Sequence, residues 1–144
     1  MFFGEYEHKL DAKGRLMVPA KFRDDLSECF YLTKGMEGCL FLFAEDEWNK
    51  IGEKINAMSQ FGRSKARAFA RVFYAGAAEL SLDKQGRILI PANLRTYASI
   101  EREAYVIGVA KRIEIWSKDK WETYSDEEFL NYESLTDELM DLDI

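Results

Sequence analysis

Apolar and charged positions alternate near the start of the chain, as they do in a strand with one buried face. Tyr6, His8 and Leu10 fall on one side, and charged residues fill the positions between them. This period of two predicts a half-buried strand over residues 5–10. Because His8 occupies an apolar position of that pattern, we expect a packed structural histidine rather than a catalytic one.

A turn, a short strand and a helix are expected next. Asp11 and Gly14 suit the first and fourth positions of a type I turn. Pro19 should end the following strand and open a helix to about Leu26, because its missing N–H needs no partner in a first helical turn. The other elements expected in the first half are strands at 30–34 and 39–43 and helices at 45–58 and 64–74.

The second half repeats this order. Both halves contain D-x-x-G-R, as Asp11-Ala-Lys-Gly-Arg15 and Asp83-Lys-Gln-Gly-Arg87, followed by an apolar strand and Pro-Ala. A strand at 78–82, a helix at 92–98, strands at 104–109 and 113–116, and a short helix capped by Ser117 are expected there. Gly35, Leu40, Leu42, Phe43 and Trp48 match Gly108, Ile113, Ile115, Trp116 and Trp121 at an offset of 73. The repeat predicts pseudo-two-fold symmetry.

The repeated turn also predicts a binding site. Turn geometry explains the aspartate and the glycine but not an arginine in both copies. A surface pair between Asp11 and Arg15 contributes only about 0–1 kcal/mol to stability. A pre-oriented guanidinium is better suited to gripping phosphate or reading guanine. The candidate DNA-binding residues are Asp11, Lys13, Gly14, Arg15, Asp83, Lys84, Gly86 and Arg87.

The net charge of −6 over 144 residues is unevenly distributed. Residues 121–144 hold nine acidic residues and no basic one, so residues 1–120 carry a net charge of +3. Overall acidity therefore does not exclude a nucleic-acid partner. Two cysteines and one histidine make neither a disulfide framework nor a metal site, no cofactor is expected, and no segment reaches membrane-spanning length.

Two surfaces remain open to several interpretations. Arg63, Arg67 and Arg71 recur every four residues on the helix expected at 64–74, after a break at Gln60–Arg63. This stripe fits a solvated face, a subunit contact or an extra phosphate contact. The acidic tail begins with a capping box, Ser125-x-x-Glu128, and fits either a weak amphipathic helix or a mobile tail.

The pattern Asp-x-x-Gly-Arg, apolar strand, Pro, helix resembles the swapped-hairpin AbrB-type DNA-binding module. Two such modules, the opening Met-Phe-x-Gly-Glu-Tyr and Asp83-Lys-Gln-Gly-Arg87-Ile-Leu-Ile-Pro91 resemble the MraZ family over residues 1 to about 121. The resemblance implies an α+β fold in which two SpoVT/AbrB-type modules form a pseudo-two-fold β-barrel core flanked by helices. The expected segments are modules at 5–50 and 77–121, connecting helices at 51–76 and an acidic tail at 122–144.

For function, the resemblance implies a cytoplasmic, nucleoid-associated transcriptional regulator that represses its own operon in the division and cell-wall gene cluster. The partners would be double-stranded DNA with repeated sites and further copies of the chain in a ring-shaped homo-oligomer. The D-x-x-x-R motifs, here Asp11/Arg15 and Asp83/Arg87, would contact DNA. One module offers too few cations for tight binding, so several subunits would need to bind together.

Two other classes of function compete with this reading. A protein-interaction scaffold would use the ring surface or the acidic tail to bind a protein partner. An enzyme would need Asp11 and Asp83 as paired carboxylates. The arginine beside each aspartate favours a low pKa, which makes a poor general acid, so we expect no enzymatic activity.

Overall fold

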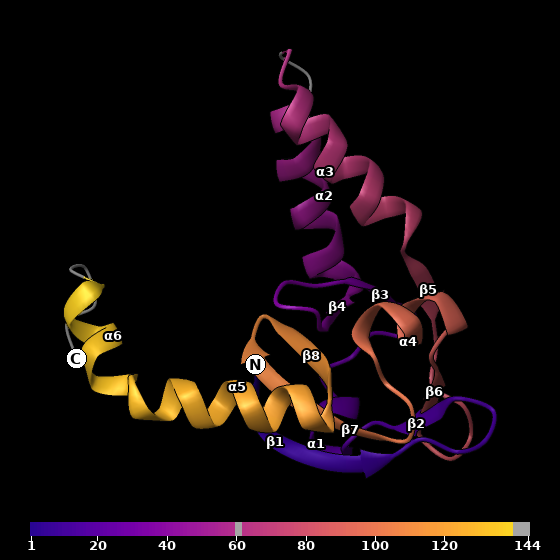
Figure 1. Cartoon of the computed structure of the whole chain (residues 1–144). Coiled ribbons are helices and arrows are strands. Elements are labelled where there is room, and N and C mark those ends of the chain that lie inside the picture. Colours follow the sequence, from indigo (N-terminus) through magenta and orange to yellow (C-terminus); the bar gives the residue numbers. More distant parts are fainter. Residues whose placement is uncertain (60–61, 140–144) are drawn as a thin grey trace.

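The computed structural model describes residues 1–59 and 62–139, and Gln60, Phe61 and the tail residues 140–144 lie outside the described part. Strands and helices combine in an α+β arrangement (Figure 1). The elements of the first half are β1 (Phe2–Lys9), β2 (Arg15–Met17), α1 (Ala20–Arg23), β3 (Phe30–Lys34), β4 (Leu40–Ala44), α2 (Glu45–Ser59) and α3 (Ser64–Ala75). Those of the second half are β5 (Ala78–Leu80), β6 (Arg87–Leu89), α4 (Ala92–Ala98), β7 (Glu103–Ala110), β8 (Arg112–Ser117), α5 (Lys118–Leu130) and α6 (Tyr132–Glu138).

The expected order of elements is confirmed in both halves. The helix after Pro19 is shorter than expected, because α1 ends at Arg23 rather than near Leu26. Beyond it, the N–H of Asp25 donates to the Phe22 carbonyl and that of Leu26 to the Arg23 carbonyl. These bonds span three residues, so the chain closes in tight turns instead of continuing an α-helix.

The main sheet shows the expected two-fold pseudo-symmetry. Its six strands lie in the order β1-β7-β8-β4-β3-β5, with all neighbours antiparallel. The corresponding strands β4 and β8 pair at the centre, where Leu40 faces Ile115 and Leu42 faces Ile113. Each strand that precedes a D-x-x-G-R turn pairs with the other half, β1 with β7 and β5 with β3. The two halves are therefore interlocked rather than side by side.

A closed barrel is not found among residues 1–59 and 62–139. β1 and β5 form the two ends of the six-stranded sheet, while β2 and β6 form a separate two-stranded ribbon. A barrel requires a continuous set of hydrogen-bonded neighbours around the axis. The swapped-hairpin barrel expected from the sequence therefore stays a prediction, and the structure supports the antiparallel α+β architecture.

Both faces of the main sheet are buried, because alternate residues of β4 enter two different clusters. Leu40 and Leu42 pack against Leu16 and Ile88 of the ribbon, whereas Phe41 and Phe43 lie beneath the helices on the other face. The hairpin formed by α2 and α3 covers this second face and projects from the sheet (Figure 1). The β2–β6 ribbon and the helical hairpin therefore lie on opposite sides of the sheet.

The C-terminal helices differ from the sequence expectation. Ser117 caps α5 as predicted, its hydroxyl accepting from the Lys120 N–H at 3.3 Å. The predicted capping box at Ser125 is wrong, because Ser125 lies inside α5 and donates to the Glu122 carbonyl. Trp121 packs on Trp116 in the second cluster, and this tertiary contact favours an unbroken helix. None of the described helices has the length and apolarity needed to cross a bilayer.

Candidate nucleic-acid interface

Each D-x-x-G-R turn is organised around its aspartate. The Asp11 Oδ1 accepts from the backbone N–H groups of Lys13 and Arg15, both at 2.9 Å, and Oδ2 accepts from Arg15 Nε at 2.6 Å. The carboxylate thus holds the backbone of the turn and the guanidinium together. Because the Asp11 carboxylate accepts only from Nε of the Arg15 guanidinium, the two Nη nitrogens of Arg15 still carry donors for a further acceptor.

The second turn repeats this geometry. The Asp83 Oδ1 accepts from the N–H groups of Gln85 and Arg87 at 2.9 Å, and its Oδ2 accepts from Arg87 Nε at 2.9 Å. In both turns the glycine N–H donates to the aspartate carbonyl at 3.0 Å. Two positions 72 residues apart therefore present an arginine in the same local setting.

The hydrogen bonds of the turns shift the acidity of both aspartates. The N–H of Arg15 is the largest cause that lowers the pKa of Asp11, from an ordinary value of 3.8 to about 2, with further help from the Arg15 side chain. The N–H of Arg87 is likewise the main cause of a lowered pKa at Asp83. Both carboxylates are therefore ionised at neutral pH, and neither is suited to donate a proton in catalysis.

Tertiary structure brings the two turns together. β2 and β6 pair antiparallel, with Leu16 opposite Ile88. The Val18 N–H donates to the Gly86 carbonyl and the Ile90 N–H to the Gly14 carbonyl, both at 3.0 Å. The strand after each turn is thus bonded to the other turn. The eight residues proposed from the sequence consequently lie together in the fold rather than at two separate places.

The ribbon has a buried and an exposed face. Leu16 and Ile88 point into the first cluster and are almost fully buried. Arg15 and Arg87 lie on the other face, half-buried, and Leu89 is 54% exposed beside them. Arg15 stands opposite Leu89, so the two arginines are diagonal neighbours, a relationship that separates Cα atoms by roughly 7–8 Å.

Two further arginines lie at the turns and were not predicted. Arg95 of α4 packs on Gly14, where an added Cβ would stand 2.9 Å from the guanidinium carbon, and Arg23 of α1 packs on Gly86. Arg23 Nε also donates to the Val18 carbonyl at 2.8 Å. Each arginine thus comes from the helix that follows the other turn. The repeated spacing of Pro-x-x-x-Arg after both strands is a sequence signal that would have found them.

The glycines are required by these turns. Gly14 has φ of +86° and Gly86 has φ of +79°, a region that L-residues with a side chain rarely adopt. Lys13 and Lys84 are both exposed but occupy different turn positions, the third and the second. The interface therefore combines a symmetric pair of arginines with an asymmetric pair of lysines.

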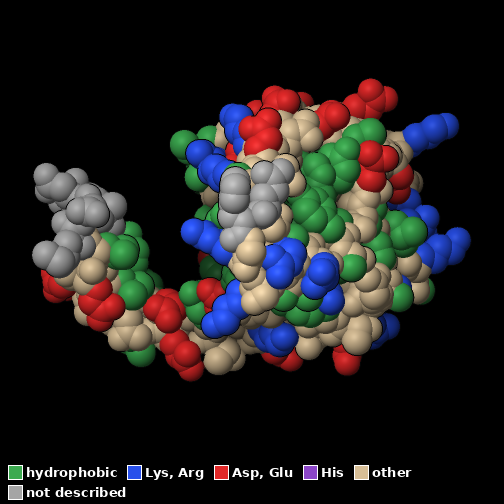
Figure 2. Space-filling view, turned by 90° about the horizontal axis from the view of Figure 1, so that it is seen from above, with side chains coloured by type: hydrophobic (Ala, Val, Ile, Leu, Met, Phe, Trp, Pro, Cys, Tyr) green, Lys and Arg blue, Asp and Glu red, His purple; other side chains and the backbone are tan. Residues whose placement is uncertain are grey.

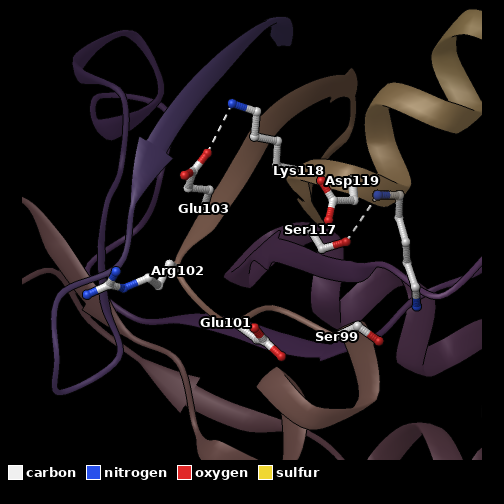
Figure 3. A pocket seen from close by; sticks show the side chains of 8 residues that line it. Ser99, Glu101, Arg102, Glu103, Ser117, Lys118 and Asp119 are labelled. Atoms are coloured by element: carbon white, nitrogen blue, oxygen red, sulfur yellow. Dashed lines mark hydrogen bonds and ion pairs between the residues drawn. The ribbon is translucent and has the colours of Figure 1, made fainter.

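A hollow elsewhere on the molecule has no residue of the turns in it (Figure 3). Lys118 there forms ion pairs with Glu103 at 3.0 Å and Glu7 at 3.4 Å. These carboxylates raise the Lys118 pKa, first through the hydrogen bond to Glu103. The positive charge of Lys118 is thus neutralised by carboxylates of the protein itself. The hollow therefore offers no unbalanced charge that would attract a charged ligand. Within the described residues no group of three or more acidic, histidine or cysteine side chains is placed to hold a metal ion.

The chain matches one protein family twice along its length. The family model described as "MraZ protein, putative antitoxin-like" matches residues 1–72 and 73–142. A protein named Transcriptional regulator MraZ from Acetivibrio thermocellus is 50% identical, and its counterpart from Finegoldia magna is 52% identical, each over 144 residues that cover all of both chains. Another from Thermoanaerobacter sp. is 51% identical over the same full length.

The extent of these two family matches corrects one boundary that was expected from the sequence. The resemblance was expected to end near residue 121, but the second match continues to residue 142. It therefore includes α5 and α6, which follow the second sheet module without a break at 121.

Proposed function

The chain belongs to the MraZ family, and from this premise we propose that it is a sequence-specific, double-stranded-DNA-binding regulator of transcription. The β2–β6 ribbon is the surface that contacts DNA. The single observation that carries this assignment is the placement of Arg15 and Arg87 on one exposed ribbon face, each oriented by its own aspartate. The relatives are named as regulators of transcription, and the family is not one of enzymes.

The two-stranded form of the ribbon supports binding in the major groove. That groove admits a two-stranded β-ribbon, and an arginine that offers two donors can bind guanine O6 and N7 together. Arg15 and Arg87 would supply those contacts. The exposed Lys13 and Lys84 at the turn tips would approach the phosphates on either side, since phosphate contacts position a protein without reading sequence.

The cross-module arginines support the same interface. Arg23 and Arg95 are fixed against the turn glycines by bonds to the carbonyls of Val18 and Ile90. They bring two more positive charges beside the ribbon. The exchange of contacts between the halves is also what a swapped-hairpin module requires, and it supports assigning residues 5–50 and 77–121 to two such modules.

The expected biological setting belongs to this proposal. The protein would act in the cytoplasm, associated with the nucleoid, and repress its own operon in the division and cell-wall gene cluster. A ring-shaped homo-oligomer would place several ribbons on repeated DNA sites. Linked sites raise overall affinity without any new contact, which compensates for the few cations of one ribbon.

Gel-shift titration against the upstream region of the protein's own gene tests the proposal. Arg15→Ala and Arg87→Ala should each weaken binding by roughly tenfold or more at fixed salt, since one bidentate contact contributes about 1–3 kcal/mol of discrimination. Arg102→Ala, at an exposed arginine outside the ribbon, is the matched control and should bind normally. Unchanged affinity of a folded Arg15→Ala, Arg87→Ala double variant would contradict the assignment.

A further inference from the structure

The far end of α5 exposes large apolar side chains that have no cover within the described chain. Phe129 is 80% exposed, Leu130 is 84% exposed and Tyr132, at the start of α6, is 69% exposed. The first turns of α5 are different, since Trp121 and Tyr124 pack into the second cluster. We define residues 125–139 as the C-terminal arm. Contiguous exposed apolar groups of this kind mark an interaction surface.

The second helix of the arm is amphipathic. Tyr132 and Leu135 are three residues apart and share one side of α6, Leu139 follows directly after the helix, and all three are exposed. Glu133 and Asp137, four residues apart, form an acidic row beside that apolar side. The arm therefore offers an apolar strip bordered by negative charge, and a complementary surface would be apolar and basic.

The part of the α2–α3 hairpin beyond Glu53 has those properties. Residues 54–78 contain five lysines and arginines and no acidic residue. Arg71 is exposed, Arg67 is half-buried, and the apolar Val72 and Tyr74 are 56% and 42% exposed. Figure 2, which looks down on the hairpin, shows Lys and Arg side chains gathered around it and acidic and apolar side chains along the arm.

The hairpin is also badly placed to bind DNA together with the ribbon. It covers the face of the main sheet opposite to the cluster that contains Leu16 and Ile88. A phosphate contact by Arg67 or Arg71 would require the same duplex to reach both sides of the sheet. Of the interpretations of the arginine stripe, a contact between subunits fits this position best.

We propose that the C-terminal arm of one copy docks on the α2–α3 hairpin of a second copy. The two surfaces carry opposite charge and exposed apolar groups, and Figures 1 and 2 show the far end of the arm standing apart from the hairpin of its own chain. The inference rests on the homo-oligomer of the proposed function and names the surfaces that build it. A contact between two different patches propagates from copy to copy and closes a ring when the rotation permits.

This arrangement leaves the DNA site accessible. The first turns of α5, which lead into the arm, and the hairpin both pack on the side of the sheet that carries the second cluster, whereas Arg15 and Arg87 lie on the β2–β6 ribbon beyond the first. Assembly through arm and hairpin would therefore cover neither arginine. Each copy in the ring would present its own ribbon to DNA.

Charge reversal on one surface at a time should dissociate the assembly. The first variant, Arg67→Glu with Arg71→Glu, replaces two arginines of the hairpin by acidic residues, which would face the acidic row of the arm. The second, Glu133→Lys with Asp137→Lys, replaces the acidic row of the arm by a basic one, which would face the basic residues of the hairpin. Each alone should show a native mass below that of the unmodified protein, measured by light scattering after size exclusion. The exposed pair Arg102→Glu with Lys111→Glu makes an equal charge change elsewhere and should keep the full mass.

Mixing the two variants provides the decisive measurement. In an alternating assembly the reversed row of the arm would face the reversed residues of the hairpin, and the unmodified row would face the unmodified arginines, so an equimolar mixture should recover the native mass. Circular dichroism of each variant establishes that it is folded before mixing. Full mass for either variant alone, or no recovery in the mixture of two folded variants, overturns the arm-on-hairpin contact.

The result can be separated from the proposed function. If the reversed variants keep the full mass and the unmodified ring still requires Arg15 to bind DNA, the docking inference fails and the DNA-binding function stands. If the mixture recovers its mass but the unmodified assembled protein binds DNA no better than the same protein carrying Arg15→Ala and Arg87→Ala, the function fails and the docking stands. A monomeric unmodified protein overturns both the ring and the docking contact.

Discussion

Arg87 of the second motif lies 3.6 Å from Asp11 of the first, measured from Nη1 to Oδ2. The same Asp11 oxygen also accepts from Arg15 Nε. Asp11 therefore contacts both arginines of the ribbon, whereas within residues 1–59 and 62–139 Asp83 forms an ion pair with Arg87 alone. Two motifs that are equivalent in sequence are unequal in the folded chain.

This inequality predicts different effects for the two aspartates. Asp11→Asn should weaken DNA binding more than Asp83→Asn, because it removes the charge that orients two guanidinium groups instead of one. Dissociation constants from parallel gel-shift titrations at the same salt concentration measure the difference. Equal losses for the two variants would show that the cross-motif pair does not matter for binding.

Replacing an arginine without removing its charge tests the bidentate contact. Arg15→Lys should retain part of the phosphate attraction but lose the forked pair of donors, and so lose selectivity for the preferred DNA sequence. We expect the ratio of specific to non-specific affinity to fall by roughly tenfold, corresponding to about 1.4 kcal/mol. Lys84→Arg, at an exposed turn position, is the control and should leave that ratio unchanged.

Salt dependence reports the phosphate contacts. The logarithm of the binding constant should fall linearly with the logarithm of salt concentration, by about 0.9 for each phosphate neutralised. Removing a turn-tip charge with Lys13→Ala should make that slope shallower without changing which sequence is preferred. A slope near zero for the unmodified protein would be incompatible with a phosphate-based grip.

Acid should destabilise the fold partly through Asp11. Its folded pKa of about 2 lies below its ordinary value of 3.8, so the unfolded chain binds the proton more readily. The stability it contributes is present above the ordinary value and is lost as the pH falls through about 2. Thermal unfolding between about pH 5 and pH 2 should show a smaller decrease in Tm for Asp11→Asn than for the unmodified protein.

A side chain at Gly86, on which Arg23 packs, should lower the stability of the fold. An alanine Cβ at Gly86 would stand 2.7 Å from Arg23 Nε, in addition to the cost of about 1–2 kcal/mol for a left-handed backbone. Gly62 has φ of +69° and no described atom within 4 Å of such a Cβ, so Gly62→Ala measures the backbone cost alone.

Chemical denaturation gives the comparison. Gly86→Ala should lose more stability than Gly62→Ala, and adding Arg23→Ala should recover part of the difference by removing the crowded guanidinium. If Gly86→Ala and Gly62→Ala lose the same stability, Arg23 moves away without cost and does not support the turn.

Some expectations failed where packing overrode local sequence. Ser125 has the residues of a helix start but lies within α5, because Trp121 holds the preceding turns against the core. The repeated Pro-x-x-x-Arg spacing marks Arg23 and Arg95 as equivalent, but nothing within their own helices indicates that each crosses to the opposite turn. Both cases concern contacts made between distant segments, which local periodicity does not describe.

The sequence by itself determined the repeat, the order of elements and the chemistry of each D-x-x-G-R turn. These features depend on residues within a few positions of one another: the Asp11 carboxylate reaches its own turn, and Gly14 supplies the backbone conformation. Only the tertiary structure decided that the two turns form one interface. Leu16 and Ile88 must be buried in one core, and their burial pairs β2 with β6 and brings Arg87 to Asp11.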